Sequence, residues 1–399
     1  MSLSGFSEER LARIPAFLEA QVASGALPGA QALIWRRGQI AHHSLQGRMD
    51  IARGLPMRAD AIFRIYSMTK PITTVALLML LEEGKVALDD AVAQYIPGFA
   101  RLKLADGTVA GDKMTVRDLL RHTSGLTYGF HNRTPIDAEY RRLRVADPDT
   151  DGGLPAMIAQ IESLPLEYAP GTQWVYSVAT DVVGYLIQII SGIPLGDFIR
   201  NRILRPLAMT DTDFIVPREK ADRFAACYQA MPAGLELYTA WPNEKYFTAP
   251  KLESGGGGLA GTAADYLRFA RMLLNKGELD GVRLLKPQTV ALMTMNHLPG
   301  GGDIVSLSPA GDAFTESGYR GMGFGLGVSV TLDPAQVGIP GTAGEFAWGG
   351  MASTAFFVDP IEDMVVVFMT QVITDTPRRV KLRRDLRTLI YDAMTDKHA

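Results

Sequence analysis

One tetrapeptide of the chain holds the residue types of a serine nucleophile and its base. Ser67 and Lys70 stand three residues apart in the only S-x-x-K match, and Pro71 follows directly. Proline is tolerated in a helix only near the first turn, because it lacks an N–H and clashes with the turn before it. We therefore expect a helix that begins near Ser67, and Gly84 is a suitable residue to end it.

Such a helix would favour reaction at the Ser67 hydroxyl. Residues three apart lie on one face of a helix, so the Lys70 ammonium comes within reach of the Ser67 oxygen. The unpaired N–H groups at a helix N-terminus stabilise negative charge that develops on the serine oxygen and on an acyl carbonyl. The alternative is a plain helix cap at Ser67, with Lys70 in solvent.

Tyr176 is a second candidate for proton transfer. It stands in the segment 170–177, which begins with Pro-Gly and leads into a helix expected from Thr180. A phenol titrates near ~10, but an adjacent ammonium stabilises its anion and lowers its pKa, which makes it a usable base for a serine. The alternative is a tyrosine that packs its ring in the core.

Two adjacent glycines near the C-terminal end favour close approach of a ligand to the backbone. Trp348, Gly349, Gly350 and Met351 precede an expected strand, and glycines at a strand start leave the backbone accessible. The backbone N–H groups of Met351 and Ser67 are then the candidate oxyanion hole. The alternative is a bulge beside a packed tryptophan.

The segments that favour strands lie at the two ends of the chain. Residues 30–35 and 39–44 predict one hairpin, and residues 352–358 and 364–372 predict a second, joined by a turn at 359–363. Neither hairpin makes a stable sheet alone. One antiparallel sheet built from both ends of the chain is therefore expected.

The middle of the chain is predicted to be mostly helical. Apolar residues recur at helical spacing in residues 72–83, 116–122, 180–191 and 263–275. Together these patterns predict an α/β (α+β) fold, an antiparallel sheet flanked by helices with a mainly helical domain inserted. The expected sheet domain is 1–90 and 250–399, the insertion is 91–249, and a cleft lies between them.

Composition argues against several classes of partner. The chain has 399 residues and a net charge of -3, so no overall field would attract nucleic acid or an anionic membrane. No segment approaches the roughly 18 to 20 apolar residues of a membrane span. Residues 1–20 lack the pattern of a signal peptide, and Cys227 is the only cysteine. A cytoplasmic protein is expected, while its oligomeric state stays open.

Other motifs have weaker support. Residues 256–261 match the dinucleotide fingerprint by letter, but no strand pattern precedes them, so a loop lining the cleft is expected instead. The histidines form no H-E-x-x-H or H-x-H, so neither a metal nor a cofactor is expected. The G-x-S-x-G elbow of α/β-hydrolases is absent. His122 is expected to be structural.

The segment with Ser67 and Lys70, the segment with Tyr176 and residues 348–351 occur in this order along the chain. Together they resemble the motifs of class C β-lactamases, penicillin-binding proteins and the related esterases often called family VIII carboxylesterases. The similarity spans residues 64–360. Further segments that look like family landmarks are Leu88-Asp89-Asp90, Tyr95-Ile96-Pro97, His122-Thr123-Ser124-Gly125, residues 255–265 and Gly323-Phe324-Gly325.

The resemblance implies a β-lactamase-like fold and a role for each motif. It makes Ser67 the nucleophile and Lys70 with Tyr176 the base system. It places residues 348–351 on the substrate-binding strand, where Trp348, Gly349 and Gly350 would contact substrate. Four aromatic residues near the helical region could line an acyl pocket or pack in the core: Tyr128, Phe130, Trp241 and Phe247.

Two departures from the family pattern concern the substrate. Lactamases and peptidases of this fold carry Tyr-x-Asn, where this chain has Val178 in place of the asparagine. They also carry Lys-Thr-Gly, where this chain has Trp348 in place of the cation that recognises a substrate carboxylate. Both departures favour an uncharged ester.

The sequence therefore predicts a serine carboxylesterase that cleaves small, short-chain esters through an acyl-serine intermediate, with weak β-lactam hydrolysis as a side activity. Three alternatives stay open. They are a β-lactamase or D-amino-acid peptidase, an acyltransferase that uses an alcohol acceptor, and a non-catalytic binding protein on the same scaffold.

Overall fold

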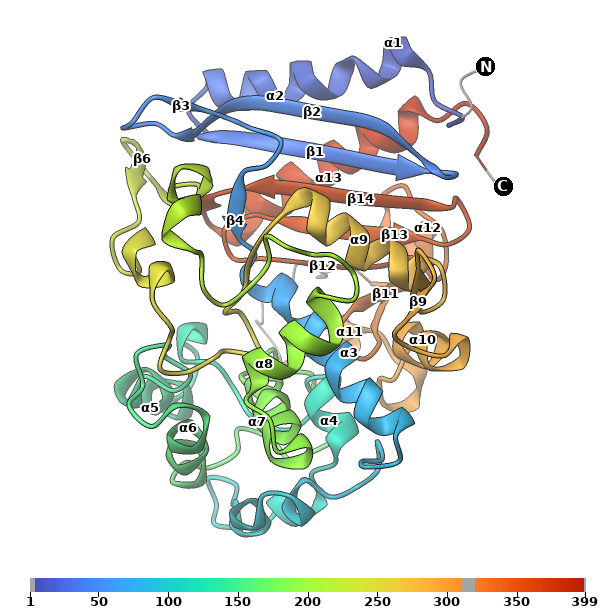
Figure 1. The fold of residues 1–399 in the computed structure, drawn as a ribbon. Coiled ribbons are helices and arrows are strands. Elements are labelled where there is room, and N and C mark those ends of the chain that lie inside the picture. The colour runs from blue at the N-terminus through green and yellow to red at the C-terminus, as the bar shows by residue number, and fades with distance from the viewer. Residues whose placement is uncertain (1–3, 310–319, 398–399) are drawn as a thin grey trace.

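An eight-stranded antiparallel sheet forms the upper half of the molecule, with strand order β10-β11-β12-β13-β14-β1-β2-β3 (Figure 1). The computed structural model describes residues 4–309 and 320–397. The strands are β1 (Gly29–Arg36), β2 (Gln39–Asp50), β3 (Leu55–Pro56), β10 (Met322–Phe324), β11 (Ser329–Thr331), β12 (Phe346–Gly349), β13 (Ala355–Asp359) and β14 (Met364–Thr370). The N-terminal β1 pairs with the C-terminal β14, from Ala30 opposite Thr370 to Arg36 opposite Met364. The prediction of one sheet built from both chain ends is confirmed.

Side chains along the central strands point alternately to the two faces of the sheet, and a separate hydrophobic layer covers each face. On β14, Val366 and Phe368 join one buried cluster, while Val365 and Val367 join another, as the two faces of a pleated strand require. The first cluster packs under α1 (Glu8–Leu11), α2 (Arg13–Ala23) and α13 (Thr376–Ala393). The second continues into the helical half of the molecule. Both faces of the sheet are therefore covered, and the first and last described segments of the chain meet beside it, where Phe6 forms a bridge with Met394.

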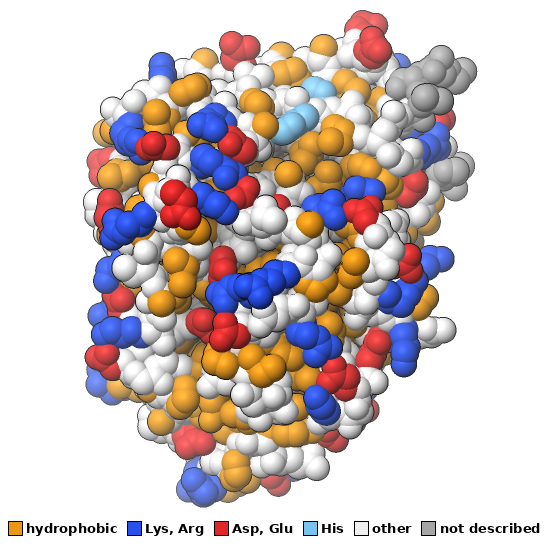
Figure 2. Space-filling model, viewed as in Figure 1, with side chains coloured by type: hydrophobic (Ala, Val, Ile, Leu, Met, Phe, Trp, Pro, Cys, Tyr) orange, Lys and Arg blue, Asp and Glu red, His pale blue; other side chains and the backbone are white. Residues whose placement is uncertain are grey.

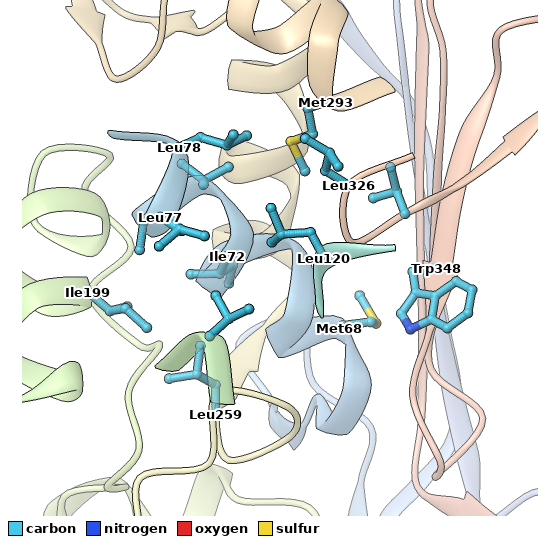
Figure 3. Close-up of a cluster of buried hydrophobic side chains, with 14 of the residues drawn as sticks. Met68, Ile72, Leu77, Leu78, Leu120, Ile199, Leu259, Met293, Leu326 and Trp348 are labelled. Carbon is cyan, nitrogen blue, oxygen red and sulfur yellow. The ribbon is translucent and has the colours of Figure 1, made fainter. Parts of the chain in front are cut away.

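Helix α3 (Thr69–Glu82) runs through the centre of the second cluster. Its residues 69–80 are all buried, so this helix has no solvent face. Figure 3 shows Ile72, Leu77 and Leu78 surrounded by side chains from several other segments. A 3-10 turn, η1 (Tyr66–Met68), precedes α3, and Gly84 has a φ of 72° just beyond its end. The expected helix start near Ser67 and end at Gly84 both agree with these bounds.

The remaining helices complete the core: most lie below the sheet around α3, and α9 (Ala263–Leu274) packs against β1, β13 and β14 of the sheet itself (Figure 1). The other helices are α4 (Val116–Leu120), α5 (Pro135–Leu143), α6 (Gly153–Glu162), α7 (Ala179–Ser191), α8 (Leu195–Ile199), α10 (Pro287–Thr294), α11 (Ile304–Leu307) and α12 (Pro334–Val337). Helix α7 packs directly against α3. The four helices expected from the spacing of apolar residues correspond to α3, α4, α7 and α9. The division into two domains stays a prediction.

The strands near the second hairpin differ from the expected ones. The strand expected at residues 352–358 begins at Ala355, and Trp348 and Gly349 belong to the preceding strand β12. The turn between them includes Ser353 at a φ of 70°, which ends the extended backbone there. Beyond β14, the short strand β15 (Val372–Ile373) leaves the large sheet and pairs with β5 (Tyr228–Met231) of the hairpin formed with β6 (Gly234–Leu237). This pairing depends on a long-range contact and was not predicted.

Figure 2 shows acidic and basic side chains interspersed over this face of the molecule, which agrees with the small net charge of -3. In the part of the chain that the structure describes, no single helix has the length and apolar character needed to cross a membrane. Only the pair Ala179–Ser191 and Leu195–Leu204, bent by 80°, meets both criteria together.

Candidate active site

Ser67 lies in the turn before α3, at the wall of a cavity of about 830 Å³. The residue before it, Tyr66, has a φ of 44°, a left-handed conformation that is unfavourable for an aromatic residue. The turn is held on both sides, because the Ile65 N–H donates to the Leu259 carbonyl at 3.1 Å and the Tyr266 hydroxyl donates to the Met68 carbonyl at 2.9 Å. The fold thus fixes the backbone that presents the Ser67 hydroxyl.

The Lys70 ammonium is aimed at Ser67 from one helical turn away. Its Nζ lies 3.4 Å from Ser67 Oγ, 3.2 Å from the Tyr128 hydroxyl and 2.8 Å from the carbonyl oxygen of Gly256. The side chain is fully buried. Burial lowers the pKa of Lys70 to about 7, although the charge of Asp181 opposes this shift. A lysine with this pKa can exchange a proton with the serine at neutral pH.

Tyr176 contacts Lys70 through the face of its ring. The Lys70 Nζ lies 4.5 Å from the centre of the Tyr176 ring, a cation–π distance. The neighbouring Val175 N–H donates to the His122 carbonyl at 2.9 Å, which fixes this segment before α7. The ring also packs against Trp348, with centroids 5.5 Å apart. Ser67, Lys70 and Tyr176 therefore meet at one site, as the motifs predicted.

Tyr128 lies closer to the proton-transfer groups than the sequence indicated. Its hydroxyl accepts a hydrogen bond from Lys70 at 3.2 Å, and its ring stacks on Phe130 at 4.6 Å. Burial and the nearby charge of Asp181 raise the pKa of Tyr128 well above its usual value. Tyr128 therefore stays protonated at neutral pH. The sequence predicted Tyr128 as a substrate contact, which stays a prediction. The structure adds a hydrogen bond by which its hydroxyl helps to fix the position of the Lys70 side chain.

The strand end at Trp348 faces the same cavity. Trp348, Gly349 and Met351 line it together with Ser67. Gly350 instead packs against the turn before Ser67, since a Cβ there would lie 2.5 Å from the Ile65 carbonyl oxygen. Glycine at 350 thus permits close contact between the Trp348 strand end and the serine turn. This contact brings the backbone of Met351 to the side of the cavity that holds Ser67.

His122 is buried beside Tyr176, with ring centroids 4.9 Å apart. Burial, helped by the Lys70 charge, lowers the pKa of His122 well below its usual value, so its ring is neutral. Its Nδ1 lies 3.3 Å from the Ser177 hydroxyl. Through these contacts His122 packs against the segment that carries Tyr176. This agrees with the structural role expected for His122.

The outer cavity has an aromatic wall and a rim of ion pairs. Aromatic residues along it are Tyr66, Tyr128, Phe130, Tyr140, Trp174, Tyr176, Phe214, Tyr238, Trp241, Tyr246 and Trp348. Phe247 is not among the residues that line the cavity; it packs against Phe224 in a cluster that also contains Trp241 and Tyr246 of this wall. At the rim, Arg144 pairs with Asp147 at 2.6 Å and Lys245 pairs with Asp149 at 2.8 Å. These two rim cations therefore each have a carboxylate partner.

The loop expected at residues 256–261 to line the cleft does so through Gly256, Gly257 and Gly258, whereas Asp181, which holds this loop, was not recognised from the sequence as part of the site. Asp181 accepts hydrogen bonds from Ser254 Oγ at 2.5 Å and from the Gly256 N–H at 3.0 Å. The one available signal was that Asp181 falls in the first turn of the helix after Tyr176, where a carboxylate is common as a capping group. In the described part of the chain, no group of three or more His, Cys, Asp or Glu side chains is placed to hold a metal ion.

A serine at the start of a buried helix, a lysine one turn later and an antiparallel sheet beside them define a serine hydrolase with a Ser–Lys pair. The chain matches the family described as Beta-lactamase over residues 14–389 and belongs to that family. The structure and the match together confirm the fold expected from the motifs.

Two curated relatives cover nearly the whole chain. Protein Rv1367c of Mycobacterium tuberculosis is 36% identical over 363 residues, which is 88% of each chain. Esterase EstB of Burkholderia gladioli is 32% identical over 377 residues, which is 90% of each chain. Among solved structures, EstCE1, a hydrolase with promiscuous acyltransferase activity, has a TM-score of 0.80 at 26% identity and covers 95% of this chain and 99% of its own. These similarities support a hydrolase related to esterases.

Proposed function

We propose that this protein is a serine carboxylesterase that cleaves uncharged carboxylic esters in two steps. Ser67 attacks the ester carbonyl and the alcohol leaves, after which water releases the acid from the acyl-serine. The observation that carries the proposal is the 3.4 Å separation of Lys70 Nζ and Ser67 Oγ in a buried setting. The similarity to esterase EstB supports the same reaction class.

Lys70 is the proposed proton acceptor. Its neutral amine takes the Ser67 proton as the serine oxygen bonds to the carbonyl carbon, and the resulting ammonium returns a proton to the leaving alkoxide. Tyr176, whose ring lies over the Lys70 ammonium, is proposed to take part in this transfer through its hydroxyl. The backbone N–H groups of Ser67 and Met351 are proposed to stabilise the oxyanion.

The nature of the cavity wall supports an uncharged substrate. Trp348 stands where relatives that recognise a carboxylate carry a lysine, and two cations at the rim, Arg144 and Lys245, are already paired with carboxylates. A cavity of about 830 Å³ is much larger than a short acyl group requires. We propose a short acyl group next to Ser67, with the remaining space available to a larger alcohol part.

Acyl transfer to an alcohol is a second candidate function, and the volume of the cavity favours it. A cavity of this volume can hold an acceptor alcohol beside the acyl-serine. EstCE1 is described as having promiscuous acyltransferase activity. A β-lactamase or D-amino-acid peptidase is less well supported, because the asparagine and lysine of those motifs are replaced by Val178 and Trp348.

The proposal is tested with p-nitrophenyl esters of graded acyl length and with a fluorophosphonate label. The wild-type protein should hydrolyse the short esters and take up the label at Ser67. Ser67→Ala should do neither, whereas Ser163→Ala, a change at an exposed helix end, should do both. Substantial turnover by Ser67→Ala would overturn the assignment. Nitrocefin hydrolysis comparable with ester hydrolysis would favour a lactamase, and ester products formed with an added alcohol would favour acyl transfer.

A further inference from the structure

We infer that Asp181 is a positioning residue for the reaction, which holds the glycine-rich loop 254–258 against Lys70 and provides the counter-charge that lets Lys70 carry a proton. The inference rests on the proposed function, in which Lys70 accepts the Ser67 proton. Asp181 lies in the first turn of α7 and is 1% exposed.

The backbone of Gly256 links Asp181 to Lys70. The Gly256 N–H donates to Asp181 Oδ1 at 3.0 Å, and the carbonyl of the same residue accepts from Lys70 Nζ at 2.8 Å. Ser254 Oγ donates to the same Asp181 oxygen at 2.5 Å, which anchors the start of the loop. Asp181 therefore sets the position of the carbonyl that orients the Lys70 ammonium.

Tyr128 and Asp181 also meet at Gly256. A Cβ on Gly256 would lie 2.5 Å from Asp181 Oδ2 and 3.0 Å from the Tyr128 hydroxyl, so both oxygens sit against its Cα. The Tyr128 hydroxyl is in turn 3.2 Å from Lys70 Nζ. Lys70, Tyr128 and Asp181 thus surround one glycine, and a side chain at this position would separate them.

The charges around Lys70 make Asp181 the relevant counter-ion. The other titratable groups that face the ammonium are His122, Tyr128 and Tyr176. Burial lowers the pKa of His122 and raises the pKa of Tyr128, so both are neutral at neutral pH and neither supplies a counter-charge. Glu253, next to the loop, is directed instead to the Gly196 N–H at 2.7 Å. Burial alone drives a lysine toward its neutral form, and a buried carboxylate opposes this. The pKa of Lys70, lowered to about 7 by burial, is kept from falling further by Asp181.

This arrangement has a defined role in catalysis. When the Ser67 O–H bond breaks, its proton forms an N–H bond on Lys70 and the charge of the resulting ammonium is balanced by Asp181. The ammonium then gives the proton to the leaving alkoxide, and Lys70 becomes neutral again. Without Asp181, the protonated lysine is less stable, so the first transfer is slower.

The test compares Asp181→Asn with Ser254→Ala. Asp181→Asn keeps an oxygen that can accept from Ser254 and Gly256 but removes the charge, so the pKa of Lys70 falls. The acidic limb of the pH profile of kcat/KM should move to lower pH by about 1 pH unit or more, and kcat should fall. Ser254→Ala loses one loop hydrogen bond but keeps the charge, so its acidic limb should stay at the wild-type pH.

The rate of fluorophosphonate labelling at Ser67, measured over the same pH range, gives a second readout that does not depend on ester turnover. An acidic limb of Asp181→Asn that coincides with wild type would overturn the inference while the esterase proposal stands. Absence of labelling in the wild-type protein would instead contradict the proposed function. If Asp181→Asn does not fold, Asp181→Ser, which is smaller and also neutral, carries the same expectation.

Discussion

The ammonium nitrogen of Lys70 lies 2.8 Å from the carbonyl oxygen of Gly256. The two residues are 186 positions apart in the chain, and their contact joins the start of α3 to the glycine-rich loop. Nearby, Thr73 Oγ1 donates to the Gly255 carbonyl at 2.8 Å, so a second contact of the same kind lies one turn along the helix. The site thus depends on Gly255 and Gly256, which have no side chains, running close to a buried helix.

Gly256→Ala should disable the site, whereas Gly257→Ala should not. A Cβ at 256 would meet Asp181 and Tyr128 oxygens at 2.5 and 3.0 Å, but a Cβ at 257 would find its nearest atom 3.8 Å away. Displacement of the loop should lower kcat by on the order of 100-fold in Gly256→Ala. Ester kinetics of both variants check this, with thermal unfolding as the control. Equal kcat values would contradict the importance of the close approach.

Activity should depend on pH through Lys70. The neutral amine is the proposed proton acceptor, so kcat/KM should fall as the pH decreases through about 7, where Lys70 becomes charged. Lys70→Arg keeps a positive charge at every accessible pH and should be inactive throughout the range. A profile measured with a short p-nitrophenyl ester tests both expectations. A wild-type rate that is flat from about pH 5 to 9 would exclude Lys70 as the base.

The two tyrosines near Lys70, Tyr176 and Tyr128, should contribute unequally to kcat. Tyr176→Phe should lower kcat by about 100-fold or more with little change in KM, because it removes a hydroxyl proposed to transfer a proton. Tyr128→Phe should cost less, since burial and Asp181 raise the pKa of Tyr128 and keep it protonated. Steady-state kinetics of the two variants under identical conditions make the comparison. A larger loss of kcat in Tyr128→Phe than in Tyr176→Phe would indicate that Tyr128, and not Tyr176, takes part in the proton transfer.

A second buried cluster should make stability depend on pH. The Tyr391 hydroxyl lies 2.9 Å from a Glu345 oxygen and 2.5 Å from an Asp359 oxygen, although it has one hydrogen to donate. Burial raises the pKa of Glu345 to about 7, against the effect of the Arg387 charge. The folded state therefore favours protonated Glu345. The contribution of protonated Glu345 to the free energy of unfolding is fully present below the ordinary glutamate pKa. This contribution is lost as the pH rises through about 7.

The wild-type protein should consequently unfold at a lower temperature at pH 8 than at pH 5.5, with a change from this group of at most about 3 kcal/mol. Glu345→Gln, which is neutral at both pH values, should reduce this difference. Glu244→Gln, at an exposed position, should not. Thermal unfolding of the three proteins at the two pH values is the measurement. A wild-type midpoint that rises with pH would contradict a protonated Glu345.

The features that depend on neighbouring residues could be predicted from the amino-acid sequence alone. Ser67 and Lys70 are one helical turn apart, and Pro71 can be accommodated only near a helix start, so their proximity followed from local geometry. The hairpin of β1 and β2 likewise followed from two strand-forming runs separated by a short turn. These features need no information about the rest of the chain.

The contacts between these segments follow from the folded chain and could not be predicted from local patterns. The tertiary structure placed Asp181 on α7 and Gly256 on a distant loop against Lys70, and it gave Trp348 to β12 rather than to a strand start. It also showed that Tyr128 presents its hydroxyl to Lys70 while Tyr176 presents its ring. The charge on Lys70 depends on burial and on Asp181, both of which arise from packing between segments far apart in the chain. No pattern of neighbouring residues specifies such contacts, because many loop paths and helix packings satisfy the same local preferences.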